Sequence, residues 1–138
     1  MNTINLTSTH YFGFLYLAFA HQTDGIYSRE EQISIWKLVV KWSEVELSRI
    51  EHAKIMDEVM LLYKSNILNT DFEEYIFDIA RIINEYSWFC NSKKIESLKD
   101  LKTIALSDKK YLKSEKNWIK KIAEIWNIDK KKIQNILK

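Results

Sequence analysis

Two stretches of the chain decide how it folds: DGIYSREEQISIWKLVVKW at residues 24–42 and DKKYLKSEKNWIKKIAEIW at residues 108–126. They begin 84 positions apart and share an aspartate, a glutamate seven positions later, and an apolar frame behind the two acids. The matching pairs are Asp24 and Asp108, Glu31 and Glu115, Ile35 and Ile119, Leu38 and Ile122, Val39 and Ala123, and Trp42 and Trp126. The match predicts that the two halves are copies of one helical unit.

The composition predicts helices throughout the chain. Its 138 residues are 46% hydrophobic, include two glycines and lack proline. Because glycine and proline punctuate turns, strands and bulges, their scarcity favours helices joined by short polar links. A chain of this length can bury roughly two thirds of its unfolded surface in one core. We therefore expect an all-α fold, with a single domain over residues 1–138, built as a compact bundle of about seven helices with an internal pseudo-two-fold repeat.

The spacing of apolar residues predicts where the helices lie. The segment from Tyr11 to Ala20 is apolar on nearly all sides, as is typical of a central buried helix. As a helix this segment would span about 15 Å, whereas the core of a bilayer is roughly 30 Å thick. We therefore expect that the protein is not an integral membrane protein. The expected helices cover about residues 6–21, 28–42, 45–66, 72–89, 95–105 and 112–126, followed by a short helix after Asp129.

Capping residues support several of these helix starts. Ser28 with Glu31, and Thr70 with Glu73, have the spacing of a capping box, in which each side chain bonds the other residue's backbone amide. Asp129 can cap the last helix in the same way as other N-terminal aspartates. Capping of the helix start, without any binding role, is therefore one explanation for a glutamate at position 31.

Charge is distributed unevenly along the chain. Residues 1–92 carry 7 Lys/Arg and 13 Asp/Glu, whereas residues 93–138 carry 14 Lys and 6 Asp/Glu. The basic segment would attract the acidic one within the fold, and it could also attract a polyanion. Because these lysines alternate with apolar positions and acids, a solvated helix face is the simpler interpretation.

The single cysteine indicates a reducing compartment. Cys90 has no partner for an intramolecular disulfide, which favours the cytoplasm. It lies beside Trp88 and Phe89, so we expect it to be a small buried hydrophobic residue. The first ten residues contain no Lys or Arg, so no signal peptide is expected there.

The sequence lacks the common catalytic motifs. With two glycines and no paired histidines, it cannot supply a glycine-rich phosphate loop, a nucleophile elbow or an HExxH zinc helix. His10, His21 and His52 are isolated in the sequence, although His21 lies close to Asp24. We expect a protein that is not an enzyme.

The repeated acids are the best candidates for a binding site. Asp24, Glu31, Asp108 and Glu115 are hard oxygen ligands, which suit calcium, magnesium or manganese better than zinc. The segment after Asp24 does not fit an EF-hand, so a metal site would have to form between the two copies. If the four carboxylates converge, a cation or a Lys/Arg partner should accompany them, because they would otherwise repel one another.

The C-terminal region suggests an alternative function. Ala123, Asn127, Ile128, Ile133 and Ile136 match the spacing of a helix-turn-helix. Three lysines, residues 130–132, would then lie at the start of the second helix, where recognition helices meet DNA. The segment has no arginine for bidentate recognition of guanine. DNA binding is therefore the alternative hypothesis, and nucleic acid is the less favoured partner.

The motifs resemble one known family. Residues 17–20 (LAFA), residues 24–31 (DGIYSREE), and the segment from Asp108 to Ile128 are similar to the tellurite-resistance TerB-like family, which also includes the N-terminal domain of DjlA-type co-chaperones. The resemblance covers most of the chain at the level of pattern, and its specific part is the two acidic motifs with their flanking helices. The second copy departs from the pattern by having Lys109 in place of the glycine.

This resemblance implies a compact all-helical fold with internal pseudo-symmetry and an acidic face proposed to bind metal ions. The positions carried over are Asp24, Glu31, Asp108 and Glu115, with a divalent cation (calcium, magnesium or manganese) as the only cofactor. The chain contains no HPD tripeptide, so no co-chaperone role follows. The implied function is a cytoplasmic module that binds a cation, a protein partner or a membrane-associated complex in a stress or tellurite-resistance response.

Overall fold

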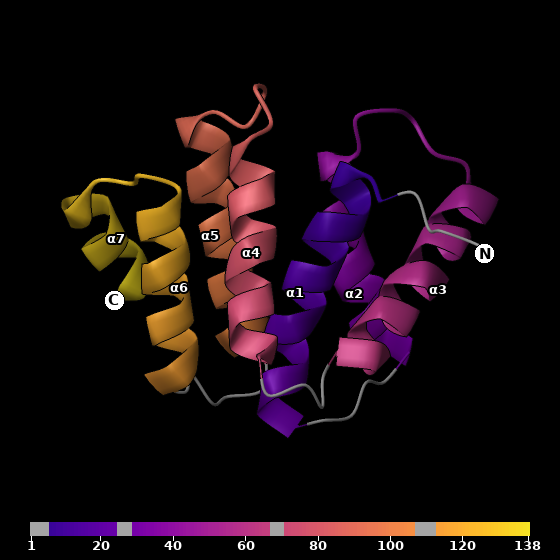
Figure 1. The fold of residues 1–138 in the computed structure, drawn as a ribbon, viewed down its shortest axis with the longest axis horizontal. Helices are drawn as coiled ribbons and strands as arrows, with labels where there is room; N and C mark the ends of the chain where they lie inside the picture. Colours follow the sequence, from indigo (N-terminus) through magenta and orange to yellow (C-terminus); the bar gives the residue numbers. More distant parts are fainter. Residues whose placement is uncertain (1–5, 25–28, 67–70, 107–112) are drawn as a thin grey trace.

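In the part of the chain that the structure describes, seven α-helices and one short 3-10 helix form a bundle (Figure 1). The computed structural model describes residues 6–24, 29–66, 71–106 and 113–138, and the side chains of these residues except 21–31 and 113–115. In chain order the elements are α1 (Ser8–Asp24), α2 (Arg29–Val39), the 3-10 helix η1 (Val40–Trp42), α3 (Arg49–Asn66), α4 (Phe72–Asn84), α5 (Asn91–Leu106), α6 (Lys113–Ile125) and α7 (Lys130–Leu137). The described residues contain no strand, and the all-α prediction is confirmed.

Helix α1 is the centre of the bundle, as its uniformly apolar sequence predicts. All residues from Phe12 to Ala20 are buried. The helix packs against α2, α3, α4 and α5, while α6 packs on α4 and α5, and α7 on α5 and α6. Figure 1 shows α2 and α3 on one side of α1 and the remaining helices on the other. Burying each large side chain of α1 contributes roughly 1.5–3 kcal/mol.

A glycine in α1 allows two other helices to approach closely. A Cβ atom at Gly13 would lie 3.2 Å from Val59 Cγ2 on α3 and 3.3 Å from a ring carbon of Trp36 on α2. These separations are shorter than ordinary van der Waals contact, which is about 3.5–4.0 Å between carbons. The absence of a side chain at Gly13 therefore permits the packing of α2 and α3 on α1.

Aromatic rings join the two ends of the chain in the core. Phe12 stacks on Trp42 with centroids 4.8 Å apart, and Phe89 meets Trp126 edge to face at 4.9 Å. Trp126 is fully buried, and its Nε1 donates a hydrogen bond to the Ala80 carbonyl oxygen at 2.9 Å. The repeat-related tryptophans, Trp42 and Trp126, are therefore both core residues.

The link between η1 and α3 corrects one expected boundary. Residues 43–48 lie outside helices, and α3 begins at Arg49 rather than near residue 45. Ser43 has an extended backbone, which ends the helical path after Trp42. Ser48 and Glu51 form a reciprocal capping box: the Glu51 amide donates to Ser48 Oγ at 3.2 Å, and the Ser48 amide donates to Glu51 Oε1 at 3.1 Å. The sequence has this motif, but it was not among the two predicted boxes.

The link between α4 and α5 corrects two further expectations. Helix α4 ends at Asn84 rather than near residue 89, and α5 begins at Asn91 rather than near residue 95. Cys90 is exposed, so its predicted burial is wrong. The aromatic side chain of Phe89 takes the buried position, and Cys90 instead lies at the N-terminus of α5 with its Sγ 3.2 Å from Ser92 Oγ.

Other predicted caps have different outcomes. Asp129 Oδ1 accepts a hydrogen bond from the Lys131 amide at 3.3 Å, so the cap of the last helix is confirmed. Thr70 and Ser28 lie outside the described residues, and Asp71 is the residue that precedes α4. Within the described part of the chain, no helix is both long and apolar enough to span a bilayer.

Helix positions agree with the duplication hypothesis. Shifting α2 by 84 residues places its start at Lys113, the first residue of α6, and shifting α1 places its start one residue after Asn91, the first residue of α5. The hypothesis of a repeat predicts this coincidence, but the repeat itself stays a prediction.

Candidate functional site

The helix bounds place three of the four candidate acids on regular elements. Asp24 is the last residue of α1, while Glu31 and Glu115 are each the third residue of their helices, α2 and α6. Asp108 lies outside the described residues, and the side chains of the other three are not described. The two glutamates therefore occupy equivalent backbone positions, where the N-terminal end of a helix dipole favours a negative charge.

The relative position of these helix ends bears on the predicted metal site. Figure 1 shows the last turn of α1 and the first turns of α2 and α6 along one edge of the bundle, with α1 between the other two. Among the side chains that the structure describes, no group of three or more His, Cys, Asp and Glu residues could hold a metal ion. That finding does not include the four candidate acids, and the site stays a prediction.

A polar cluster that the sequence did not indicate lies at the centre of the molecule. Tyr16 on α1 donates from its hydroxyl to Asp100 Oδ2 on α5 at 2.8 Å and accepts a hydrogen bond from Trp42 Nε1 at 2.9 Å. Its oxygen also lies 3.0 Å from Ser97 Oγ on α5. Lys41 extends this cluster, with Nζ 2.7 Å from Asp100 Oδ2 and 2.6 Å from Glu96 Oε2. We call these residues the Tyr16 cluster.

The surroundings of Tyr16 and Lys41 favour the protonated form of both side chains. Burial raises the pKa of Tyr16 well above its usual value, and the Asp100 charge raises it further, so the hydroxyl remains protonated. For Lys41, burial alone would lower the pKa, but the hydrogen bonds and charges of Asp100 and Glu96 outweigh it and raise the pKa. The charged lysine therefore lies beside a partly buried carboxylate.

The Tyr16 cluster joins the two parts of the chain. Tyr16 and Asp100 are 84 positions apart, the offset that separates the two copies of the acidic motif. In a two-fold arrangement, equivalent residues meet only near the symmetry axis. Their contact is what a pseudo-two-fold axis between α1 and α5 would produce. Sequence patterns could not identify it, because a tyrosine and an aspartate at equivalent positions do not look like a repeat.

A histidine at the start of α1 has a structural role. His10 is 3% exposed, and its Nδ1 accepts a hydrogen bond from the Thr7 amide at 3.0 Å and lies 2.8 Å from Thr7 Oγ1. With Nδ1 as acceptor, the proton is on Nε2, which donates to Glu58 Oε1 on α3 at 3.1 Å. His10 thus caps α1 and ties it to α3. Because the Thr7 amide occupies Nδ1, this ring is not arranged to deprotonate a substrate.

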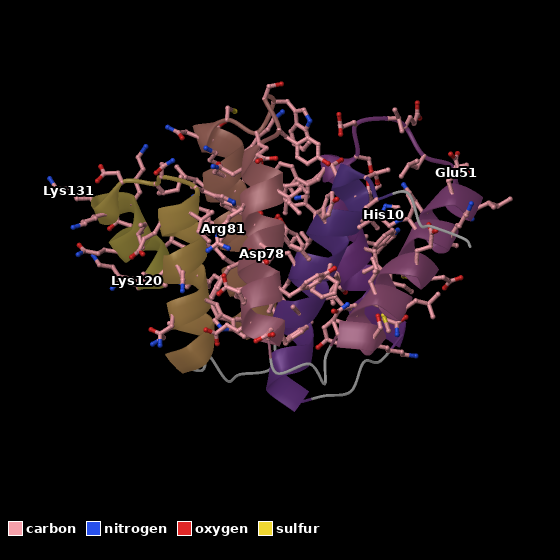
Figure 2. The ribbon with its side chains drawn as sticks, viewed as in Figure 1. His10, Glu51, Asp78, Arg81, Lys120 and Lys131 are labelled. Carbon is pink, nitrogen blue, oxygen red and sulfur yellow. The ribbon has the colours of Figure 1, made fainter. Side chains whose placement is uncertain are left out.

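The C-terminal helix pair has the geometry that its spacing predicted. Asn127 adopts φ 59°, the left-handed conformation that ends α6, and its neighbour Ile128 is buried. Ile133 and Ile136 anchor α7 in the core. Lys131 is exposed at the tip of α7 (Figure 2), as are the lysines on either side of it. The turn is therefore present, but packed helix pairs of many functions share it, and it gives no support to DNA binding by itself.

Fold and sequence together define a class of protein and a family. The chain is a small all-α bundle, and three of the four candidate acids, Asp24, Glu31 and Glu115, lie in the last or first turn of a helix. The model of the family described as tellurite resistance protein TerB matches residues 15–138, nearly the whole chain. The chain belongs to the TerB family, and the resemblance inferred from the acidic motifs is confirmed. No curated protein and no solved structure matches it.

Proposed function

We propose that this protein is a non-enzymatic TerB module of the cytoplasm that binds a divalent cation, or a protein partner, through Asp24, Glu31, Asp108 and Glu115. The response that it serves would be a stress or tellurite-resistance response, as the family description suggests. The carrying observation is the equivalent placement of Glu31 and Glu115, each on the third residue of a helix. Carboxylate oxygens at such positions suit calcium, magnesium or manganese.

One shared site is the arrangement that we propose, with carboxylates from both copies of the motif. The segment after Asp24 does not fit a calcium loop that would hold an ion by itself.

Calorimetric titration tests cation binding and its stoichiometry. Calcium, magnesium and manganese are added separately to the native chain and to the variant with Asp24→Asn and Asp108→Asn. We expect one ion per native chain, and a loss of affinity of roughly ten-fold or more in the variant, because the shared site loses two charged ligands. Asp57→Asn with Glu85→Gln is the matched control, since both residues are exposed acids elsewhere.

Each outcome of the titration has a definite meaning. Two ions per chain would contradict a single shared site. Unchanged binding in the variant with Asp24→Asn and Asp108→Asn would place the ion elsewhere and contradict the proposed ligands. No heat with any of the three cations would remove cation binding and leave the acidic edge as a partner surface only.

A further inference from the structure

The charged side chains of α5 are divided between two sides of that helix. Its two acids are both held by Lys41 of η1, whose Nζ lies 2.6 Å from Glu96 Oε2 and 2.7 Å from Asp100 Oδ2. The acids are therefore directed toward η1. On the side of α7, Lys102 Nζ donates a hydrogen bond to the main-chain oxygen of Lys138. The side of α5 that lies next to α7 is thus left to lysines.

Helix α7 adds further lysines on the same side. It packs on α5, and its apolar residues Ile133 and Ile136 are buried. Lys131, Lys132 and Lys138 are exposed. Because Lys131 and Lys138 are seven positions apart, they share one face of the helical path, away from the buried isoleucines. Figure 2 shows Lys131 at the outer tip of α7.

The lysines of α5 and α7 form a surface with a net positive charge. We call it the basic face, and it consists of Lys99, Lys102, Lys131, Lys132 and Lys138. Within the described part of the chain, no ion pair involves any of these five side chains. Five lysines against two negative groups, Asp129 and a terminal carboxylate at Lys138, leave a net charge of +3. A partner of this surface should therefore be anionic.

An exposed leucine beside the basic face distinguishes between anionic partners. Leu106 is the last residue of α5, is 44% exposed, and follows Lys99 by seven positions, which places both on one face of the helix. A membrane surface offers phosphate and carboxylate groups to lysines and acyl chains to a leucine. The nucleic acid backbone offers a leucine no such partner. Arginine, which suits bidentate phosphate recognition, is absent from residues 93–138.

We propose that the basic face binds the anionic surface of a membrane, with Leu106 placed among the lipid headgroups. Only the choice of membrane rests on the proposed function, because the cytoplasmic leaflet is the one rich in anionic lipids. The basic face is built from α5 and α7 and does not include the repeated acids. Failure of cation binding therefore leaves membrane binding intact, and failure of membrane binding leaves cation binding intact.

Sedimentation with lipid vesicles provides the test. The native chain is mixed with vesicles of phosphatidylcholine alone, or of phosphatidylcholine with phosphatidylserine, in a chelator that removes divalent cations. We expect the chain to pellet only with the vesicles that contain phosphatidylserine, and to be released as salt is raised, because salt screens exposed charges. The chelator prevents a cation from bridging the repeated acids to the lipid.

Matched variants locate the site. Lys99→Gln with Lys131→Gln should weaken vesicle binding by roughly ten-fold or more, because each lysine near an anionic surface raises the affinity by roughly five-fold. Lys54→Gln with Lys64→Gln removes the same charge from exposed positions of α3 and should bind nearly as the native chain does. Circular dichroism should show the native helix content in both variants, since all four side chains are exposed.

The leucine separates lipid from nucleic acid. Leu106→Ser should weaken vesicle binding by roughly three-fold or more, because its apolar side chain no longer contacts the acyl chains. The net charge of this variant is that of the native chain, so a purely electrostatic attraction would not change.

Three results would overturn the proposal. They are no pelleting with phosphatidylserine vesicles at low salt, equal pelleting with both kinds of vesicle, and equal losses in Lys99→Gln with Lys131→Gln and in its matched control. Duplex DNA is the remaining arm: retardation of DNA by a chain that does not pellet with vesicles would assign the basic face to nucleic acid.

Discussion

Replacing Tyr16 by phenylalanine should destabilise the protein more than any other loss of a single oxygen atom among its tyrosines. The ring is fully buried, so Tyr16→Phe keeps the packing and removes only the hydroxyl of the Tyr16 cluster. Trp42 Nε1 then loses its acceptor, and Asp100 loses a donor but keeps Lys41. A buried group without a partner costs about 1–3 kcal/mol, and a hydrogen bond to a charged group contributes about 1.5–3 kcal/mol.

The expected loss is therefore about 3 kcal/mol in the free energy of unfolding. For 138 residues the unfolding entropy is about 0.3 kcal/mol/K, so the Tm should fall by roughly 10 °C. Urea denaturation followed by circular dichroism gives the free energy, and a thermal scan gives the Tm. Tyr75→Phe is the matched control, because Tyr75 is partly buried and its hydroxyl has no hydrogen bond to any residue that the structure describes, so that variant should lose less than about 0.5 kcal/mol.

A double-mutant cycle with Trp42→Phe separates the hydrogen bond from general damage to the core. If the Tyr16 hydroxyl stabilises the protein through its hydrogen bond with the Trp42 indole, the loss of unfolding free energy in the double variant should be smaller than the sum of the losses in the two single variants. The expected difference is about 1 kcal/mol. A Tyr16→Phe variant as stable as the native chain, or full additivity in the cycle, would refute the reasoning.

Two further predictions concern helix starts. The hydrogen bond from Ser92, with the Lys93 amide, lowers the pKa of the Cys90 thiol, so alkylation by iodoacetamide should reach its half-maximal rate at a lower pH than for a free cysteine. Ser92→Ala should move that profile to higher pH, and an unchanged profile would contradict the assigned cause. The Ser48 amide lowers the pKa of Glu51, so the stability contributed by this cap is present above the unfolded pKa and is lost as pH falls through the folded pKa. Glu51→Gln should remove this part of the pH dependence of stability, measured by urea denaturation at neutral and acid pH, and an unchanged dependence would exclude the linkage.

Local patterns were sufficient for much of the fold. The uniform apolar character from Tyr11 to Ala20 predicted the central helix, and the carboxylate of Asp129 predicted the last cap. Both depend on residues within about one helical turn, where side-chain chemistry and helical period act directly. The predicted burial of Cys90 was wrong because it does not follow from a local pattern. Which of several neighbouring residues lies in the core depends on where the chain bends after α4.

The candidate site divides in the same way. The sequence alone singled out Asp24, Glu31, Asp108 and Glu115, and a site formed by them stays a prediction. It could not indicate the Tyr16 cluster, in which the partners of Tyr16 are 26 and 84 positions away. Hydrogen bonds between residues so far apart in the sequence follow no periodic pattern along the chain.

By itself, the sequence determined the class of the fold, most of the helices and the repeated acids. Helical period, capping chemistry and the scarcity of glycine and proline act over a few residues and are therefore visible in order along the chain. The tertiary structure decided that Tyr16 meets Asp100, that Cys90 faces outward, and that residues of α6, α7 and the turn between them line a groove. These features depend on which helices pack together, because buried polar groups must find partners wherever the core brings them.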